Sequence, residues 1–471
     1  MRPRILFINA VNPNDEGEID MPPLGLGYLV SSLREEFGDD AIKFKIINQN
    51  VAQEIKNFKP DFVGITSTTK NYGRAIDYAK IVKRYDLPVV IGGVHISTLP
   101  SSLTNDMDVA VIGEGEETII DLFNLFEREK SFAKNKLERI DGIAFKNNGK
   151  LILTRRRKPI EPLDKIPVPA RDLFEIGSAT HMLTSRGCLY RCVFCSTSHF
   201  WGKPRFFSAE YVVNEIKTLV EKYKVKDILI FDDLFTINLK RIEQIVRLLK
   251  KEDIIGRVAF HCNARANHLN DRMMQLLKKM NVKSLVMGLE SGCERTLKYL
   301  KANTVTVEDN KKAVELCHKY RIGCNASFII GSPEETEKDI LATLKFIKKT
   351  QVDNFNIFIL TPLPGTPVWG YAKKRNLIDE KNIDWNVLDI TADNLEDAVI
   401  LSEKLSKERL YDLFMKFKKL AKSRRVKYVI KTGFKNPYRI PTFLIEKFKG
   451  LRRKYCRVMQ QKVVIEKNRF L

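Results

Sequence analysis

Three cysteines stand close together in the segment TSRGCLYRCVFCS, residues 184–196. Cys188, Cys192 and Cys195 follow the spacing C-x3-C-x2-C, and the aromatic Phe194 precedes the last of them. Thiolates at this spacing converge on one soft metal centre. The next cysteine is Cys262, so no fourth thiol follows nearby. Three ligands to a four-iron cluster would leave one iron open for a substrate or a cofactor.

Two other interpretations of the three thiols stay open at this point. His199 follows Cys195 at the spacing of a zinc ligand, so a site of three cysteines and one histidine is possible on ligand count. Alternatively, the thiols are reduced bystanders. A disulfide framework is not expected, because eight cysteines are sparse in 471 residues and the cytosol keeps thiols reduced.

The cysteines follow the first strand of a repeated strand–helix pattern. Apolar runs predict six strands, with amphipathic helices between them. The predicted strands are His181–Ser185, Asp227–Asp232, Arg257–Asn263, Ser284–Leu289, Asn325–Ile330 and Asn354–Leu360. The predicted helices are Glu210–Tyr223, Leu239–Lys250, Asp271–Lys279, Asp309–Tyr320 and Glu337–Lys349. Six such units in series indicate a barrel or part of one, in which chemistry lies at the carboxyl ends of the strands.

Charged residues end the second, third and fourth of these strands. Asp232 and Asp233 end the second, and only one of them should face the barrel mouth because side chains alternate along a strand. Arg265 follows the third strand and is suited to bind a carboxylate with two hydrogen bonds. Glu290 follows the fourth and is suited to accept bonds from paired hydroxyls. A helix cap, a surface salt bridge and an ion pair inside the mouth are the purely structural alternatives.

Residues 1–135 predict a parallel, doubly wound sheet. The predicted strands are Arg4–Asn9, Lys43–Asn48, Phe62–Ser67, Pro88–Gly93 and Val109–Gly113, and the predicted helices include Leu24–Phe37 and Tyr72–Tyr85. Such sheets bind ligands beyond the carboxyl ends of their strands. The small or polar residues there are Ser67, Thr68, Thr69, Gly92, Gly93 and Gly113. They are candidate ligand contacts, although the need of the chain to turn explains them equally well.

Residues 136–178 predict a hairpin and a linker. Asn-Asn-Gly separates two short strands within Gly142–Thr154, which is a good hairpin signal. The Pro-rich stretch that follows should be extended. The predicted organisation is therefore a front domain at 1–135, this connector at 136–178, a barrel domain at 179–395 and a basic helical region at 396–471.

The positive charge is concentrated in the last part of the chain. Formal net charge is +23, and residues 403–471 hold 22 basic and 5 acidic residues, which is +17. This distribution indicates a basic appendage on a near-neutral core. Aromatic and leucine residues interleave with the basic ones. We expect first that the appendage packs on the barrel and second that it contacts an anionic membrane surface; a nucleic-acid contact is the least favoured alternative.

Targeting and membrane signals are weak. The first residues, MRPRILFINAVNPND, lack the apolar segment of a signal peptide. No stretch reaches 18 uncharged apolar residues. We therefore expect a cytoplasmic protein, with the basic region as its one candidate for peripheral membrane contact.

The segment RGCLYRCVFC closely resembles the cluster-binding loop of the radical S-adenosylmethionine (SAM) superfamily. The resemblance implies that Cys188, Cys192 and Cys195 bind a [4Fe-4S] cluster whose open iron is chelated by the amino and carboxylate groups of SAM. One electron, from a reductant such as flavodoxin or ferredoxin, then cleaves SAM to methionine and a 5′-deoxyadenosyl radical. The positions that resemble SAM contacts of the family are Phe194, Asp232, Asp233, Arg265, Glu290, Ser327, Ile329 and Gly331.

The resemblance also implies separate roles for these residues. Phe194 and Ile329 would lie against adenine, with Gly331 allowing close approach, and Arg265 would pair with the methionine carboxylate. The chain departs from the family twice: FDD stands where many members have Gly-Gly-Glu, and Ser327 stands where a glycine is common. TPLPGTP, residues 361–367, resembles the loop after the sixth strand in one subgroup.

The front domain resembles the cobalamin-binding domain of the B12-dependent radical SAM enzymes. The resemblance rests on PPLGLGYLVSSL, GITSTT, GGVHISTLP and GEGEETIIDLF, and with the barrel it spans about residues 1–370. It implies a Rossmann-like fold whose glycines and hydroxyls hold cobalamin. One departure is that His95 follows Gly-Val, so the Asp-x-His-x-x-Gly motif, which supplies a lower cobalt ligand in many cobalamin domains, is missing. A degenerate domain that no longer binds cobalamin is the alternative.

Together these features predict an α/β protein with a doubly wound cobalamin-binding domain, a partial (β/α)6 TIM-like barrel and a basic helical tail. The predicted function is abstraction of hydrogen from an unactivated carbon, followed by methyl transfer from methylcobalamin to a small-molecule or lipid substrate. One alternative is a radical cyclase or carbon–carbon bond-forming enzyme acting on a lipid, isoprenoid or tetrapyrrole. An alternative of a different class is a non-catalytic corrinoid- or zinc-binding protein.

Overall fold

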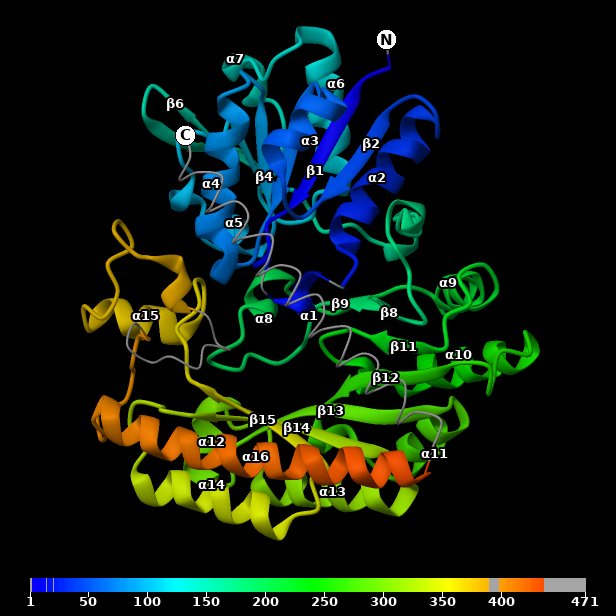
Figure 1. Cartoon of the computed structure of the whole chain (residues 1–471), viewed down its shortest axis with the longest axis vertical. Helices are drawn as coiled ribbons and strands as arrows, with labels where there is room; N and C mark the ends of the chain where they lie inside the picture. Colours follow the sequence, from blue (N-terminus) through cyan, green and yellow to red (C-terminus); the bar gives the residue numbers. More distant parts are fainter. Residues whose placement is uncertain (1, 14, 20, 389–397, 436–471) are drawn as a thin grey trace, which may run out of the picture.

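The computed structural model describes residues 2–13, 15–19, 21–388 and 398–435 (Figure 1). Its front half is built on a seven-stranded sheet in the order β2-β1-β3-β4-β5-β6-β7. The strands are β1 (Arg4–Asn9), β2 (Lys43–Ile47), β3 (Phe62–Thr66), β4 (Val89–Gly92), β5 (Val109–Val111), β6 (Ile143–Asn147) and β7 (Lys150–Leu153). The first five run parallel to one another.

Helices cover both faces of this front sheet. Side chains of α2 (Leu24–Phe37) and α6 (Glu116–Glu129) share one core with the sheet. Side chains of α3 (Val51–Phe58), α4 (Tyr72–Lys83) and α5 (Val94–Thr98) fill the other. The expectation of a doubly wound parallel sheet is confirmed. The strands β1, β3, β4 and β5 are buried along most of their length, as their continuous apolar runs predict.

The predicted hairpin joins the front sheet instead of standing apart in a connector. β6 pairs antiparallel with β5 through Ala110 and Ala144, and β7 pairs antiparallel with β6. Ile143 and Phe145 are buried in the core beneath α6. Burial of this apolar face explains why the hairpin extends the sheet.

The second half is a six-stranded, all-parallel sheet in the order β15-β14-β13-β12-β11-β8. Its strands are β8 (Ala179–Met182), β11 (Asp227–Ile230), β12 (Ala259–Ala264), β13 (Val282–Glu290), β14 (Gly323–Ile330) and β15 (Asn354–Ile359). The crossover helices are α9 (Ala209–Glu221), α10 (Leu239–Lys251), α11 (Asp271–Lys279), α13 (Val307–Tyr320) and α14 (Glu337–Lys349). Six strand–helix units in series confirm the predicted partial barrel.

Short elements complete the description. They are α1 (Glu16–Ile19), α7 (Lys134–Leu137), α8 (Thr197–Phe200), α12 (Glu294–Leu300), α15 (Pro367–Lys374) and the strand pair β9 (Ser185–Arg186) and β10 (Arg205–Phe206), with single turns of 3-10 helix between elements. Sequence-local signals account for several helix starts. Thr306 with Asp309, and Thr336 with Asp339, form capping boxes that begin α13 and α14.

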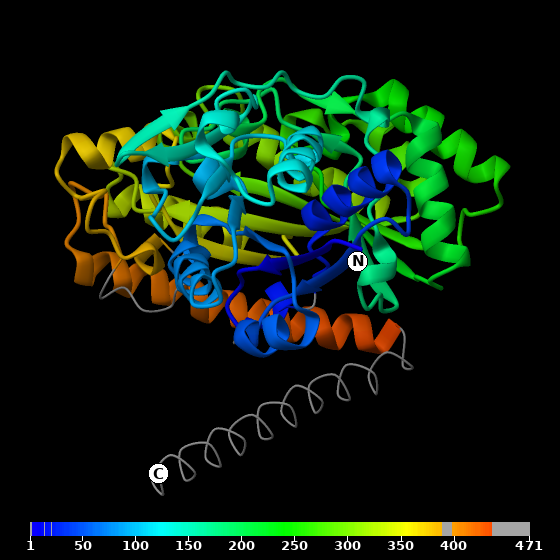
Figure 2. The same ribbon diagram turned by 90° about the horizontal axis from the view of Figure 1, so that it is seen from above.

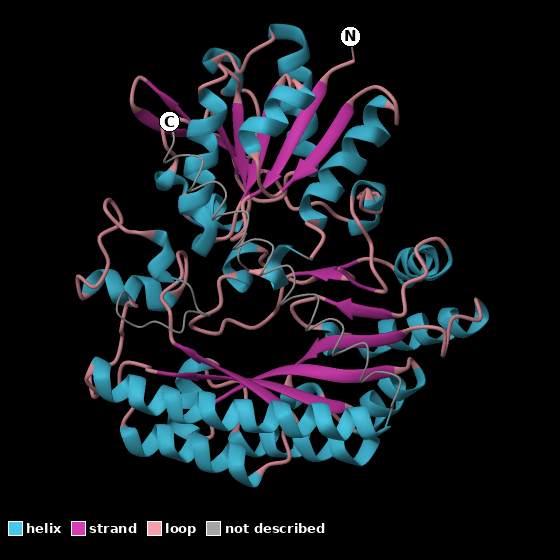
Figure 3. Ribbon diagram, in the orientation of Figure 1, coloured by secondary structure: helices cyan, strands magenta, loops and turns pink. Residues whose placement is uncertain are grey.

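The five parallel strands β1–β5 of the front sheet point with their carboxyl ends toward the barrel half (Figure 3). A segment that follows the barrel strands also contacts the front half. Trp369 of α15 and Trp385 are buried in the core between the front sheet and α4. Buried side chains that come after the linker at 154–178 in the sequence therefore help to join the barrel half to the front half.

Part of the basic tail forms the long helix α16 (Lys407–Lys435), which lies along the barrel beside β15 (Figure 2). Leu410, Leu413, Phe414 and Phe417 are buried in the barrel core. The described part of the tail thus packs on the barrel, and residues 436–471 lie outside the described residues. None of the described helices is long and apolar enough to cross a bilayer.

Candidate functional site

A cavity of about 440 Å³ lies where the carboxyl ends of the front strands meet the barrel. Its walls come from both halves of the chain. From the front half it is lined by Phe7, Gly25, Leu26, Tyr28, Leu29, Gly64, Ile65, Thr66, Val90, Gly92, Gly93, Val94, Val111, Gly113, Glu114, Gly115, Glu116 and Ile119. From the barrel half it is lined by Leu183, Ser185, Arg186, Ser196, Thr197, Phe200, Trp201, Phe231 and Asp233. This is the position at which open α/β sheets bind ligands.

The three cysteines lie beside this cavity, on the loop that joins β9 to β10. This segment, residues 187–204, is called the cluster loop below. Gly187 opens the loop with φ +92°, and a Cβ there would lie 3.1 Å from the carbonyl oxygen of Lys203. Only glycine meets both demands without strain. Burial raises the pKa of the Cys188 thiol, and the charges of Asp233, Cys195 and Cys192 raise it further.

The donor set suits a multi-iron cluster. In the part of the chain that the structure describes, no three His, Cys, Asp or Glu side chains gather around one point suited to a single metal ion. In a four-iron cluster each thiolate binds a different iron, so three thiols leave one iron open. His199, the candidate zinc ligand, has a buried Nε2 without a hydrogen-bond partner, but it forms no such group with the cysteines.

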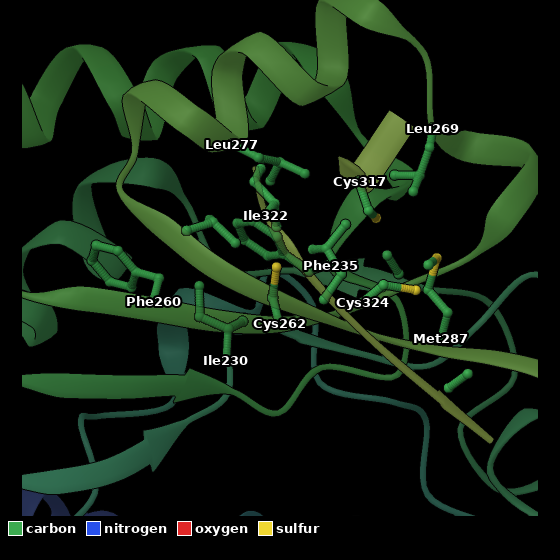
Figure 4. Close-up of a cluster of buried hydrophobic side chains, with 14 of the residues drawn as sticks. Ile230, Phe235, Phe260, Cys262, Leu269, Leu277, Met287, Cys317, Ile322 and Cys324 are labelled. Atoms are coloured by element: carbon green, nitrogen blue, oxygen red, sulfur yellow. The ribbon is translucent and has the colours of Figure 1, made fainter. Parts of the chain in front are cut away.

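The other described cysteines belong elsewhere. Cys262, Cys317 and Cys324 are buried in the core between the barrel sheet and its helices (Figure 4). Cys293 is 3.1 Å from Asp339 Oδ1, to which its thiol donates a hydrogen bond. Among the described residues the cluster loop therefore has three thiols and no fourth.

Arg265 lies directly against the cluster loop. Its Nη1 is 3.5 Å from Cys192 Sγ, and its Nη2 donates to Thr304 Oγ1 at 2.5 Å. The guanidinium carbon lies 3.6 Å from the centroid of the Tyr190 ring. The Tyr190 hydroxyl is in turn 2.6 Å from His268 Nε2. This network ties Arg265 to the loop and places its positive charge beside the Cys192 sulfur.

The two aspartates after β11 have different surroundings. Asp232 is fully buried, and its carboxylate accepts hydrogen bonds from Thr184 N, Thr184 Oγ1 and Ser185 N. Asp233 lines the cavity and accepts a hydrogen bond from Gly187 N at 3.1 Å. Burial, together with the charge of Asp232, raises the pKa of Asp233 to about 6. The question left open by strand alternation is answered: Asp233 faces the cavity and Asp232 ties the strand ends together.

Glu290 forms a buried ion pair. A register shift between β13 and β14 occurs at this position, and Glu290 has φ +57°, a left-handed conformation that is rare for a side chain of this size. Its Oε1 is 2.8 Å from Lys301 Nζ, and both side chains are less than 8% exposed. Lys301 Nζ lies 5.6 Å from the centroid of the Phe194 ring. The ion-pair alternative for Glu290 is thus the arrangement observed.

The residues with an expected adenine role lie on one apolar surface. Phe194 packs against the cluster of buried side chains that contains Ile329 and Leu300. Ser327 is half-buried on β14. Gly331 has φ +88°, and a Cβ there would lie 3.0 Å from a methyl group of Leu410. The positive φ by itself favours glycine at 331, and the approach of Leu410 from α16 adds a contact with an element that the motif itself does not contain.

The positions expected to contact cobalamin divide into two groups. Gly92, Gly93 and Gly113 line the cavity, whereas Ser67, Thr68 and Thr69 do not. A Cβ at Gly113 would meet nothing within 4 Å, so the missing side chain leaves space that opens into the cavity. The glycine edge of the front sheet thus forms one wall of the cavity.

His95 does not line the cavity. Its ring centroid lies 3.8 Å from that of Tyr72, with the rings tilted, and 4.4 Å from that of Trp385, in an edge-to-face contact. Its Nδ1 is 3.3 Å from Thr69 Oγ1. Burial lowers the pKa of His95 to about 3. No histidine is among the described residues that line the cavity, so this front domain offers no lower cobalt ligand there.

Sequence reasoning missed several residues of the site. Lys301 and Arg205 lie outside every recognised motif, Arg186 and Tyr190 lie within RGCLYRCVFC but were given no role, and Glu114 was noted only as part of a strand end. Two basic residues at the ends of the cluster loop, Arg186 and Arg205, were the available signal. Their partners lie about 70 to 90 positions away, so no local pattern reveals the pairing.

Two family models match the chain. The one described as the radical SAM superfamily matches residues 182–347, and the one described as the B12 binding domain matches residues 15–123. A protein of Pyrococcus horikoshii named as an uncharacterized methyltransferase is 35% identical over 373 residues, covering 76% of this chain and 80% of that protein. The anaerobic magnesium-protoporphyrin IX monomethyl ester cyclase of Rubrivivax gelatinosus is 25% identical over 470 residues, covering 92% and 84%.

Two solved structures share the fold. The radical SAM methyltransferase TsrM from Kitasatospora setae, solved with its tryptophan substrate and a SAM analog, has a TM-score of 0.67 at 18% identity and covers 82% of this chain and 80% of its own. The cobalamin-dependent SAM radical enzyme OxsB, solved with aqua-cobalamin and SAM, has a TM-score of 0.63 at 19% identity and covers 88% and 61%.

Proposed function

The chain belongs to the radical SAM superfamily, in the group whose radical SAM domain follows a B12-binding domain, and from this premise we propose that it transfers a methyl group from methylcobalamin to an unactivated carbon of a small molecule or lipid. As a member of this group it is an enzyme with three cofactors: a [4Fe-4S] cluster, SAM and cobalamin. The alternative of a non-catalytic corrinoid- or zinc-binding protein is set aside for this reason.

The observation that carries the proposal is the shared cavity. Its glycine edge comes from the front sheet, and its opposite wall comes from the cluster loop and Asp233. When bound, the cofactors would supply a carbon-centred radical from SAM and a methyl group from cobalamin. A cavity bounded by both cofactor-binding halves lets a substrate contact both within one dry space, which is the protein's contribution to such chemistry.

We assign the following tasks to the residues of the chain. Cys188, Cys192 and Cys195 hold the cluster. Arg265 holds the SAM carboxylate, Asp233 accepts hydrogen bonds from its amino group, and Phe194 and Ile329 bind adenine. Glu290 acts through Lys301, whose ammonium it orients beside Phe194. The cavity glycines at 92, 93 and 113 hold cobalamin.

A radical cyclisation or carbon–carbon coupling is the second candidate function. It is favoured by the magnesium-protoporphyrin cyclase among the relatives, which matches 92% of this chain. The apolar side of the cavity, formed by residues such as Leu183, Phe200 and Phe231, suits a large apolar substrate. In both functions the enzyme needs a one-electron reductant such as flavodoxin or ferredoxin.

The decisive experiment uses full-length protein purified without oxygen. The wild type should contain about four iron and four sulfide per chain and release 5′-deoxyadenosine from SAM on reduction. Cys192→Ser should lose both properties, whereas Cys293→Ser, the matched control outside the loop, should keep them. Stoichiometric zinc in the wild type, or SAM cleavage that survives Cys192→Ser, would contradict the proposal.

Methyl transfer and cyclisation are separated by the product. Metabolites and lipids of a deletion strain and its parent are compared, and the missing compound's precursor is supplied to the enzyme with methyl-labelled SAM. A product that carries the label supports methylation. An unlabelled product that has lost hydrogen supports cyclisation or coupling.

A further inference from the structure

Two buried arginines face each other where the two ends of the cluster loop meet. This strand pair, β9 with β10, is called the neck of the loop below. Arg186 of β9 and Arg205 of β10 are directly opposite in the antiparallel ladder, and the loop between them contains all three cysteines. Their side chains are only 5% and 9% exposed. Like charges opposite each other on paired strands repel, so this two-residue ladder needs a counter-charge to stay closed.

One carboxylate from the front half supplies that charge to both arginines. Glu114 Oε1 accepts hydrogen bonds from Arg186 Nη1 at 2.6 Å and Arg205 Nη2 at 3.1 Å, and its Oε2 accepts from Arg205 Nη1 at 2.9 Å. Glu114 is 7% exposed and follows β5 of the front sheet. A single residue of one domain therefore bridges the two ends of the cluster loop in the other.

The surrounding contacts hold Glu114 in place. Its Oε2 also accepts from Ile160 N at 2.7 Å, which ties it to the linker. Burial opposes ionisation, but the hydrogen bonds from Arg205 and Arg186 outweigh it and hold the pKa of Glu114 below its usual value. The carboxylate is therefore charged at neutral pH. Glu116 binds the remaining Nη2 of Arg186 at 2.5 Å.

Loss of the Glu114 charge would leave the neck with two buried cations and one carboxylate, Glu116. A buried charge without a partner is strongly destabilising, and opening the ladder to water relieves it. The ladder continues directly into Gly187 and Cys188, so an open neck leaves the backbone of the cysteine loop less firmly held.

We propose that Glu114 is a positioning residue that holds the cluster loop closed from the cobalamin-binding domain, so that the geometry of the cluster and SAM site depends on docking of that domain. The inference rests on the proposed function in one respect, that the loop carries the cluster. The bridging carboxylate itself is a property of the protein without cofactors.

The first test is hydrogen–deuterium exchange on full-length, cluster-free protein. Glu114→Gln should make residues 187–204 exchange at least tenfold faster. Glu117→Gln is the matched control, since Glu117 lies at the same helix start, is half exposed and pairs only with Arg157 in the structure's ion pairs; it should stay within twofold of the wild type. Exchange in Glu114→Gln at the wild-type rate overturns the proposal.

A rescue variant separates positioning from general damage. Glu114→Gln combined with Arg205→Gln removes one of the two facing charges, so exchange in residues 187–204 should return at least halfway to the wild-type rate on a logarithmic scale. No recovery would mean that repulsion at the neck is not the cause. If Glu114→Gln does not fold, Glu114→Asp takes its place, with at least threefold faster exchange expected and a wild-type rate overturning the proposal.

The second test uses the reconstituted enzyme. Glu114→Gln should bind iron as the wild type does but need at least tenfold more SAM to change the electron paramagnetic resonance spectrum of the reduced cluster. An unchanged SAM requirement overturns the inference. A wild type that binds neither iron nor SAM would instead contradict the proposed function, and the exchange experiment would stand independently of it.

Discussion

Neighbouring residues of this site differ more by their surroundings than by their chemistry. Asp232 and Asp233 are both carboxylates after β11, yet one is saturated by backbone and hydroxyl donors while the other faces the cavity. Similarly, Glu334 is exposed and Glu335 is buried. We therefore expect substitutions at two adjacent positions to have different effects on ligand binding and on the free energy of unfolding. Single substitutions at each position of a pair measure this difference.

For the aspartate pair we expect opposite effects. Asp232→Asn presents an amide to donors that now meet a carboxylate, and it should lower the free energy of unfolding by ~1–3 kcal/mol. Asp233→Asn should leave that free energy nearly unchanged but weaken SAM binding roughly tenfold, the loss expected for one hydrogen bond to a charged group. Denaturant unfolding and SAM titration measure the two effects. Equal effects of both variants on SAM binding would contradict the assignment.

Glu335 predicts a pH dependence of stability. Burial raises the pKa of Glu335 to about 7, although its carboxylate accepts hydrogen bonds from Gly331 N and Ser332 N. The folded state thus binds the proton more tightly than the unfolded chain, so stability is fully present below about pH 4 and is lost as pH rises toward 7. The change is at most about 3 kcal/mol, from ~1.4 kcal/mol per pKa unit.

The measurement compares denaturant unfolding at pH 5 and pH 7.5. Glu335→Gln should reduce the loss of stability between these values, since glutamine has no proton to release. Glu334→Gln, at an exposed neighbouring position, should leave the wild-type dependence intact. If both variants keep that dependence, another group is responsible.

At the scale of elements, two local arrangements define the site. The two-residue ladder β9–β10 presents the cysteine loop, and the register shift at Glu290 turns that side chain toward Lys301. The helix α16 closes the barrel beside β15, with Leu410 against Gly331. Part of the tail is thus a structural element of the barrel. Substitutions on the buried face of α16 should lower the stability more than substitutions on its exposed face.

We expect Phe417→Ala to destabilise the protein by ~3–5 kcal/mol, because the ring is fully buried and its removal leaves a cavity. Met415→Ala, on the outer face where the side chain is 44% exposed, should change stability by less than ~0.5 kcal/mol. Thermal or denaturant unfolding provides the comparison. Similar costs at both positions would mean that α16 does not pack as described.

On the scale of the whole molecule, two sheets share one cavity, and the chain crosses between them more than once. Trp369 and Trp385 return from the barrel to the front core, and Glu114 reaches from the front half to the cluster loop. These buried contacts hold the front half and the barrel half against each other around the cavity. The basic tail beyond α16 is the remaining candidate for an interaction outside the molecule.

The membrane hypothesis for the tail now has a sharper test. Because residues 407–425 pack on the barrel, removal of all residues from 403 onward would expose core side chains. Removal of 436–471 alone takes away 10 basic and 2 acidic residues and spares the packed part. If the tail contacts membranes, this truncation should abolish co-sedimentation with vesicles rich in anionic lipid, because each basic residue near such a surface contributes ~1 kcal/mol. Equal co-sedimentation of both proteins would rule the contact out.

Much of the architecture was predictable because its signals are local. The bounds of α2, α11, α14 and β1 agree with the sequence prediction residue for residue, since apolar period and capping residues act over a few positions. The position of the cysteines after the first barrel strand followed from the same patterns. Parallel strands, helical crossovers and the cysteine spacing together led to the family.

Tertiary structure alone decided which strand-end residues meet. It turned Asp233 rather than Asp232 to the cavity, placed the hairpin β6–β7 on the front sheet, brought Leu410 against Gly331, and joined Glu114 to Arg186 and Arg205. These outcomes depend on contacts between segments about 35 to 90 residues apart. The local sequence pattern does not indicate such pairings. They are selected by the burial of opposite charges and of apolar surface, and this burial occurs only when the two halves pack together.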